Sequence, residues 1–117
     1  MRIHPTQYEM FSQAARRHFE DRMVQRVGAL FPDDHEGLGE AGVRDVVRGG
    51  VDAARRHGIE EERDVAHYID LMFHLSFDFD TEEAWAAAIL GDDRLAPAER
   101  LRLIELSATS RLPTEAD

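Results

Sequence analysis

Apolar residues recur along this chain at steps of three and four positions, which is the spacing that one face of an α-helix requires. The first apolar stripe consists of Tyr8, Phe11, Ala15, Phe19, Met23, Val27 and Leu30. Its opposite, polar face consists of Arg16, Arg17, Glu20, Asp21 and Arg26. The pattern predicts a helix over about residues 6–30. It begins at Pro5 or Thr6 and ends before Pro32, because the residue before a proline avoids helical backbone.

A second helix is predicted over about residues 40–57, after a polar loop at residues 32–39. Its inner face consists of Val43, Val46, Val47, Gly50 and Ala54. Gly49 and Gly50 lie in mid-helix, where each glycine costs about 1 kcal/mol relative to alanine, so we expect a neighbouring helix to approach closely there. Gly58 suits the left-handed position that ends many helices, and Ile59 supplies the apolar contact that follows it.

The third helix is predicted to begin in the acidic run 60–62, since carboxylates are favoured at the positive end of the helix dipole. Its inner face consists of Val65, Tyr68, Ile69, Met72, Phe73 and Leu75. These positions make it the most apolar helix of the chain, and we expect it to be the most buried.

Two further helical segments complete the pattern. Asp80 precedes Glu83 by three residues, which predicts a capping box for a short helix that holds Trp85 and ends at Gly91. Pro97 is a favoured residue in a first helical turn and begins the last helix. The inward positions of that helix are Leu101, Ile104 and Leu106.

These segments predict an all-α fold, because no stretch alternates apolar and polar residues as a strand does. The chain has 117 residues, which is the length of one domain, and it can bury roughly two thirds of the surface that it exposes when unfolded. We therefore predict a single-domain bundle of four to five helices over residues 1–117, with about 1–5 and 113–117 frayed.

The formal net charge of −10 is unevenly distributed along the chain. Residues 1–58 hold nine arginines and nine Asp or Glu, whereas residues 59–117 hold five arginines and fifteen Asp or Glu. Such a surface repels the phosphates of nucleic acids and anionic lipid headgroups. We therefore expect no nucleic-acid partner and no membrane partner, whereas a basic protein is a permitted partner.

The sequence offers little material for catalysis. It has no cysteine, which excludes disulfides, thiolate catalysis and cysteine-ligated zinc. Its serines lack the glycine-elbow context of a nucleophile, and its glycines form no phosphate loop. We expect a protein that is not an enzyme and needs no cofactor. No secretory signal and no apolar run of membrane-spanning length is present, so the expected location is the cytoplasm.

A metal-binding role is the alternative. His67, Asp70 and His74 lie on one side of the third predicted helix, and a small helical metalloenzyme or metal sensor could use them. The two histidines are separated by about 10.5 Å of helical rise, whereas a zinc–imidazole bond is only about 2 Å long. A metal site would need a ligand from another helix, such as His57 or His18, so no metal ligand is assigned.

Short motifs between residues 57 and 90 resemble those of a known group of proteins. The motifs are His57-Gly58-Ile59, Asp64-Val65, Tyr68-Ile69-Asp70-Leu71-Met72, Asp78-Phe79-Asp80, Trp85-Ala86 and Ile89-Leu90. Together they resemble small helical proteins of Gram-negative bacteria that are associated with type VI secretion loci and toxic effectors. The motifs are helix caps and apolar core positions, so the resemblance implies an accessory role and brings no catalytic residues.

These observations favour a non-catalytic protein that binds another protein, as an adaptor, chaperone or immunity protein for a secreted bacterial effector. An acidic protein can mask a basic effector or toxin through charge complementarity. The predicted interface consists of acidic residues of the third and fourth helices: Glu61, Glu62, Asp70, Glu82 and Glu83.

Overall fold

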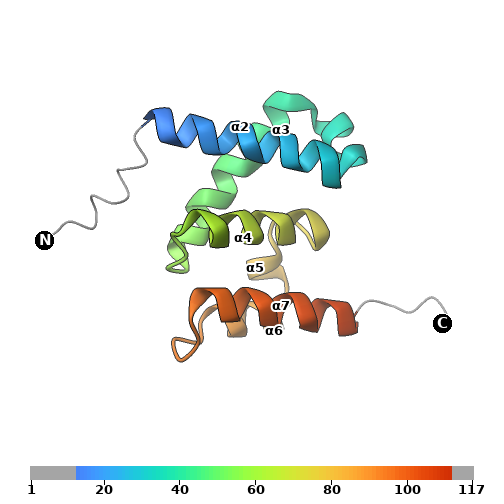
Figure 1. Ribbon diagram of the computed structural model, residues 1–117. Helices are drawn as coiled ribbons and strands as arrows, with labels where there is room; N and C mark the ends of the chain where they lie inside the picture. Colours follow the sequence, from blue (N-terminus) through green and yellow to red (C-terminus); the bar gives the residue numbers. More distant parts are fainter. Residues whose placement is uncertain (1–12, 112–117) are drawn as a thin grey trace, which may run out of the picture. The chain divides into compact units, whose positions relative to one another are not determined.

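The computed structural model describes residues 13–111, and every regular element within that range is an α-helix (Figure 1). The helices are α2 (Gln13–Leu30), α3 (Pro32–Arg56), α4 (Glu62–His74), α5 (Phe79–Glu82), α6 (Ala84–Leu90) and α7 (Pro97–Arg111). The predicted all-α class is confirmed. The described residues contain six helices rather than four or five, because the segment predicted as one short helix is divided into α5 and α6.

The chain is divided into two compact units, Met1–Ala53 and Ala54–Asp117, which we call the first and the second unit. The predicted start of the first helix, at Pro5 or Thr6, and its first apolar positions, Tyr8 and Phe11, lie outside the described residues. The segments 1–5 and 113–117, predicted to be frayed, lie outside them as well.

In the first unit, α2 follows the predicted stripe over most of its length. Phe19, Met23 and Val27 are buried, with exposed fractions of 3% or less. The helix ends at Leu30, as the proline two residues later predicts. Leu30 itself was expected on the inner stripe, but its side chain is 52% exposed. The last turn of α2 therefore leaves an apolar side chain on the surface.

The loop predicted at residues 32–39 is helical instead, because α3 begins at Pro32. Proline suits a first helical position, since the N–H that it lacks would have no partner there. Asp33 and Asp34 follow in the first turn, where their carboxylates oppose the positive end of the helix dipole. Gly39 has φ 75° and ψ 165°, and this non-helical conformation bends the chain at the residue before the predicted start of the second helix.

Beyond this kink, α3 buries most of the face that the apolar pattern predicted, whereas Val46 is only half-buried. Val43, Val47 and Ala54 are fully buried, and Gly50 is buried with them. Gly49 is exposed, and a Cβ built on it would meet nothing within 4 Å. The close helix approach expected at Gly49 is therefore wrong, because this residue lies on the outer face.

The end of α3 confirms the predicted role of Gly58. Its φ is 77°, and its N–H donates to the carbonyl of Arg55 at 2.9 Å. The N–H of Ile59 donates to the carbonyl of Ala54, also at 2.9 Å. These two bonds are the pair that defines a Schellman motif, and Ile59 is fully buried as its apolar contact.

The prediction that the third helix is the most buried is confirmed for the described helices. Six of the 13 residues of α4 are buried, a larger share than in α2, where five of 18 are. Tyr68 and Ile69 at its centre are at most 1% exposed. Phe73 and Leu75, predicted on the same face, are only half-buried. Leu75 already lies beyond the helix end.

The capping box predicted for Asp80 and Glu83 is wrong. Asp80 lies inside α5, whose N-cap is Asp78, and neither that N-cap nor the N-cap of α6 makes a side-chain capping bond. Glu83 has extended backbone, with φ −109° and ψ 109°, which separates α5 from α6. The prediction that this segment ends at Gly91 is confirmed, because Gly91 is the C-cap of α6.

The last helix, α7, begins at Pro97 as predicted and packs against α4 and α6 (Figure 1). Leu101 and Ile104 are fully buried, whereas Leu106, also expected inside, is 57% exposed. No helix among residues 13–111 is both long enough and apolar enough to cross a membrane.

Candidate functional site

Glu20 is a buried carboxylate that the sequence placed on the polar face of α2. Its side chain is only 3% exposed. Arg48 holds both of its oxygens, with Nε 3.0 Å from Oε2 and Nη2 3.2 Å from Oε1. Arg44 adds Nη1 at 3.3 Å from Oε1. Two guanidinium groups of α3 thus compensate the charge that burial of this carboxylate would otherwise leave unpaired.

Arg44 also bridges two acidic residues near the surface. Its Nη2 donates to Asp21 Oδ1 at 2.8 Å and to Glu40 Oε2 at 3.4 Å. The hydrogen bond to Asp21 is the largest cause that raises the pKa of the Arg44 guanidinium. One cation is therefore shared among three carboxylates that come from α2 and α3.

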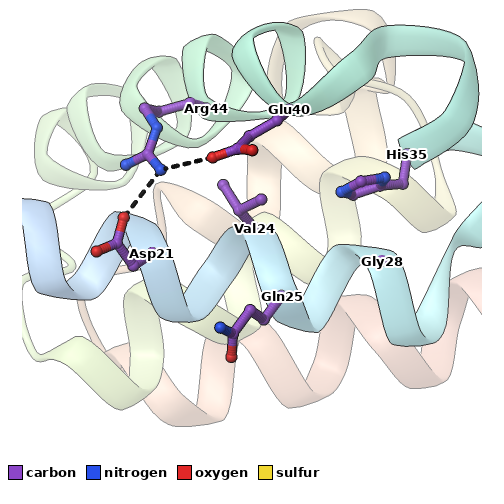
Figure 2. Close-up of a pocket in the computed structure, with 7 residues that line it drawn as sticks. All are labelled: Asp21, Val24, Gln25, Gly28, His35, Glu40 and Arg44. Atoms are coloured by element: carbon purple, nitrogen blue, oxygen red, sulfur yellow. Dashed lines mark hydrogen bonds and ion pairs between the residues drawn. The ribbon is translucent and has the colours of Figure 1, made fainter.

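A groove of about 380 Å³ lies beside this network, between α2 and the N-terminal half of α3 (Figure 2). Its lining consists of Asp21, Val24, Gln25, Gly28, His35, Glu40 and Arg44. The imidazole of His35 lies close against the backbone of α2, since a Cβ built on Gly28 would be 3.2 Å from His35 Cδ2. Glycine at position 28 therefore gives this ring its place in the groove.

His57, Tyr68 and Asp80 form a polar cluster in the second unit. His57 Nε2 lies 3.0 Å from Asp80 Oδ2, and the two side chains are 24% and 10% exposed. Burial is the main cause that raises the pKa of the Tyr68 hydroxyl, and the charge of Asp80 and the hydrogen bond to it add to the effect. The phenol therefore stays protonated at neutral pH. The cluster thus ties the end of α3 to α4 and α5.

Arg100 reinforces the same region through backbone contacts. This side chain is 9% exposed, and its Nη1 donates to the carbonyl of His57 at 3.0 Å. Its Nε donates to the carbonyls of Leu95 and Asp92 at 3.0 Å and 3.2 Å. Carbonyls beyond a helix end need donors, so this buried arginine stabilises the turn before α7 and the end of α3 together.

The predicted interface residues lie on two different parts of the second unit. Glu61 is the N-cap of α4, Glu62 is its first residue and Asp70 lies two turns further along. Glu82 ends α5 and accepts a bond from Ser76 Oγ at 2.8 Å. Glu83 accepts a bond from Trp85 Nε1 at 3.1 Å. Glu61, Glu82 and Glu83 are exposed, while Glu62 and Asp70 are half-buried.

The structure pairs one histidine of the metal-binding alternative, His67, with a carboxylate of α7. His67 Nε2 lies 2.8 Å from Glu105 Oε1 of α7, and His74 is exposed at the end of α4. Within residues 13–111, no three His, Asp or Glu side chains are grouped so that they could hold one metal ion.

The groove and Glu20 were not found from the sequence, although one signal was present. Glu20 precedes Met23, Val24 and Val27 by three, four and seven positions, so it shares their helix face. Including Val24 in the apolar stripe would have brought Glu20 onto its buried face. Its pairing with Arg44 and Arg48 has no comparable signal, because these residues are 24 and 28 positions away.

Comparison with known proteins finds no matching protein family, no matching curated protein and no matching solved structure.

Proposed function

We propose that this chain is a non-catalytic protein that binds a basic protein, as an adaptor, chaperone or immunity protein for a secreted bacterial effector. The observation that carries the proposal is the charge of the second unit. Its described part, residues 54–111, holds seven arginines and thirteen Asp or Glu. This segment of fewer than 60 residues therefore has a formal net charge of −6, since thirteen carboxylates exceed seven arginines by six.

Three of the seven arginines in residues 54–111 are engaged within the second unit. Arg100 is buried on backbone carbonyls, Arg94 binds Asp92 through both carboxylate oxygens, and Arg63 lies 3.8 Å from Glu61. Because these arginines are engaged, an approaching protein meets a predominantly negative electrostatic field. Such a field favours a basic surface and speeds the encounter with it.

The test is association with the product of the adjacent gene, measured by calorimetry at low and high salt. We expect a complex that weakens as salt rises, because exposed charges are screened over a Debye length of about 10 Å at 0.1 M. We also expect a triple variant, Glu61→Lys with Glu82→Lys and Glu83→Lys, to weaken it at low salt. These three positions are chosen because they are exposed.

The matched control is Asp52→Lys, which reverses one exposed charge on α3 in the first unit. It should leave the affinity nearly unchanged. Absence of a complex at both salt concentrations would count against the binding function. A complex that ignores both salt and charge reversal would count against the acidic interface. Circular dichroism of each variant separates lost binding from lost folding.

A further inference from the structure

We infer that the groove between α2 and the N-terminal half of α3 receives a cationic side chain, arginine or lysine, of a partner polypeptide. The inference rests on the proposed function, since it names a place where the basic partner would bind. It adds a site in the first unit to an interface that was placed entirely in the second.

The charges around the groove leave a negative balance. Glu20, Asp21 and Glu40 share the guanidinium of Arg44, and Arg48 is committed to Glu20 through two bonds. Three carboxylates against two guanidinium groups leave one negative charge in this network, and Asp45, whose Oδ1 is 4.0 Å from Arg48 Nη1, adds a further carboxylate beside it. Asp21 and Glu40 are the members near the surface. Both of these side chains line the groove and are largely exposed, at 54% and 70%.

The groove also offers acceptors that are not yet used. Arg44 binds Asp21 through Oδ1 and Glu40 through Oε2. Among residues 13–111, no donor is within hydrogen-bond distance of Asp21 Oδ2 or Glu40 Oε1. Guanidinium and ammonium groups are the side chains that bind carboxylate oxygens most strongly. An anionic ligand would meet the two carboxylates instead and would be repelled.

The shape of the groove fits a long, flexible cation. Figure 2 shows Asp21 and Arg44 at one end, Glu40 and Val24 near the middle, and His35 with Gly28 at the other end. Arginine and lysine carry an aliphatic stem that packs on apolar surface while the charged head stays with polar groups. The stem would lie along Val24 and the imidazole, and the head would reach the carboxylates.

A metal ion is a poorer occupant of this groove. The guanidinium of Arg44 already lies between Asp21 and Glu40, so a divalent cation would have to displace it to reach both carboxylates. A cationic side chain needs no such displacement, because it can bind the outer oxygens while Arg44 keeps the inner ones.

The probe is a blocked tripeptide, acetyl-Gly-Arg-Gly-amide, titrated into the full-length protein and followed by amide NMR. Its control is the same peptide with citrulline, which keeps the shape of arginine and lacks its charge. We expect the arginine peptide to shift the amide signals of Val24, Gly28 and His35 in a saturable way. The citrulline peptide should leave them in place.

Two variants locate the charge, and one serves as their control. Glu40→Gln and Asp21→Asn keep the side-chain shape and should each weaken the arginine peptide by about fivefold, the value of an exposed ion pair. Asp52→Asn removes the same charge from an exposed position outside the groove and should leave the affinity unchanged.

Three results would overturn the inference: no saturable shift in the groove, equal shifts with citrulline, or equal weakening by Asp52→Asn. Failure of the proposed function is a different result, namely no complex with the partner protein. A complex that forms normally while the arginine peptide ignores the groove would reject this site and spare the binding role.

Discussion

Glu20 and Asp21 are neighbours in the sequence and bind the same arginine, yet their surroundings differ. The Glu20 side chain is 3% exposed, whereas that of Asp21 is 54% exposed. Water can replace the partner of an exposed carboxylate, but it cannot reach a buried one without a structural change. The position of each residue on the helix therefore decides how much its ion pair contributes to stability.

We predict that Glu20→Gln lowers the free energy of unfolding by about 1–3 kcal/mol, because hydrogen bonds to a charged group are lost in a buried place. Asp21→Asn should cost less than about 1 kcal/mol, as surface ion pairs do. Urea denaturation of the two variants beside the wild type measures both values. Equal losses would show that burial does not set the strength of these pairs.

Asp92 gives a prediction about pH. Bonds from the side chain and the backbone N–H of Arg94 lower the pKa of Asp92 from about 3.8 to about 2. The folded state thus prefers the ionised carboxylate, so Asp92 stabilises the fold above about pH 3.8, and this contribution is lost as the pH falls towards 2.

The pKa of Asp92 can be measured by a carboxyl-carbon NMR titration. In Arg94→Ala the side-chain bonds vanish but the backbone N–H remains 3.0 Å from Oδ1. We therefore expect the pKa to rise part of the way back towards 3.8. An unchanged pKa would mean that the guanidinium is not its main cause.

At the scale of elements, the helix ends differ in what determines them. Gly58 ends α3 through its left-handed backbone and two bonds to the last turn. Pro32 both ends α2 and begins α3, since proline disfavours helix before it and suits the first position of a helix. The division between α5 and α6 depends on Glu83, whose extended backbone no residue type in the segment requires.

Two glycines of α3 and its C-terminal turn should respond oppositely to alanine. A Cβ on either Gly49 or Gly58 would meet nothing within 4 Å, so only the backbone conformation matters. Gly58 has φ 77°, and alanine there should cost about 1–2 kcal/mol. Gly49 is helical, and alanine there should add about 0.5–1 kcal/mol of stability. Thermal or urea unfolding of both variants measures the sign; the same sign for both would contradict the argument.

Over the whole molecule, the net charge of −10 favours the approach of positively charged molecules. The first unit is close to balance, with seven arginines against nine Asp or Glu in residues 1–53. The second unit carries most of the deficit. A field of one sign acts at distances longer than a hydrogen bond, so it governs the encounter more than the final fit.

We predict that salt acts mainly on the rate of association with the basic partner. Between low and physiological salt the association rate constant should fall about tenfold or more, while the dissociation rate constant changes much less. Stopped-flow mixing at several salt concentrations separates the two constants. A salt effect confined to dissociation would indicate short-range contacts instead of steering.

The sequence by itself determined the helical class, most helix ends and most core positions of the described residues. Val27, Val43 and Tyr68 are buried where the three- and four-residue spacing placed them. Gly58 has the left-handed backbone that its position after the last turn predicted. These features depend on neighbours within about two turns, so the local pattern of residue types contains the necessary information.

Only the tertiary structure decided which distant side chains meet. Glu20 binds Arg48 across 28 positions, and His57 binds Asp80 across 23. The candidate groove exists because α2 and α3 pack at a particular register. No local rule specifies that register, since it follows from how whole helix surfaces fit together. The proposed binding of a partner at this groove therefore rests on the part of the structure that local patterns do not encode.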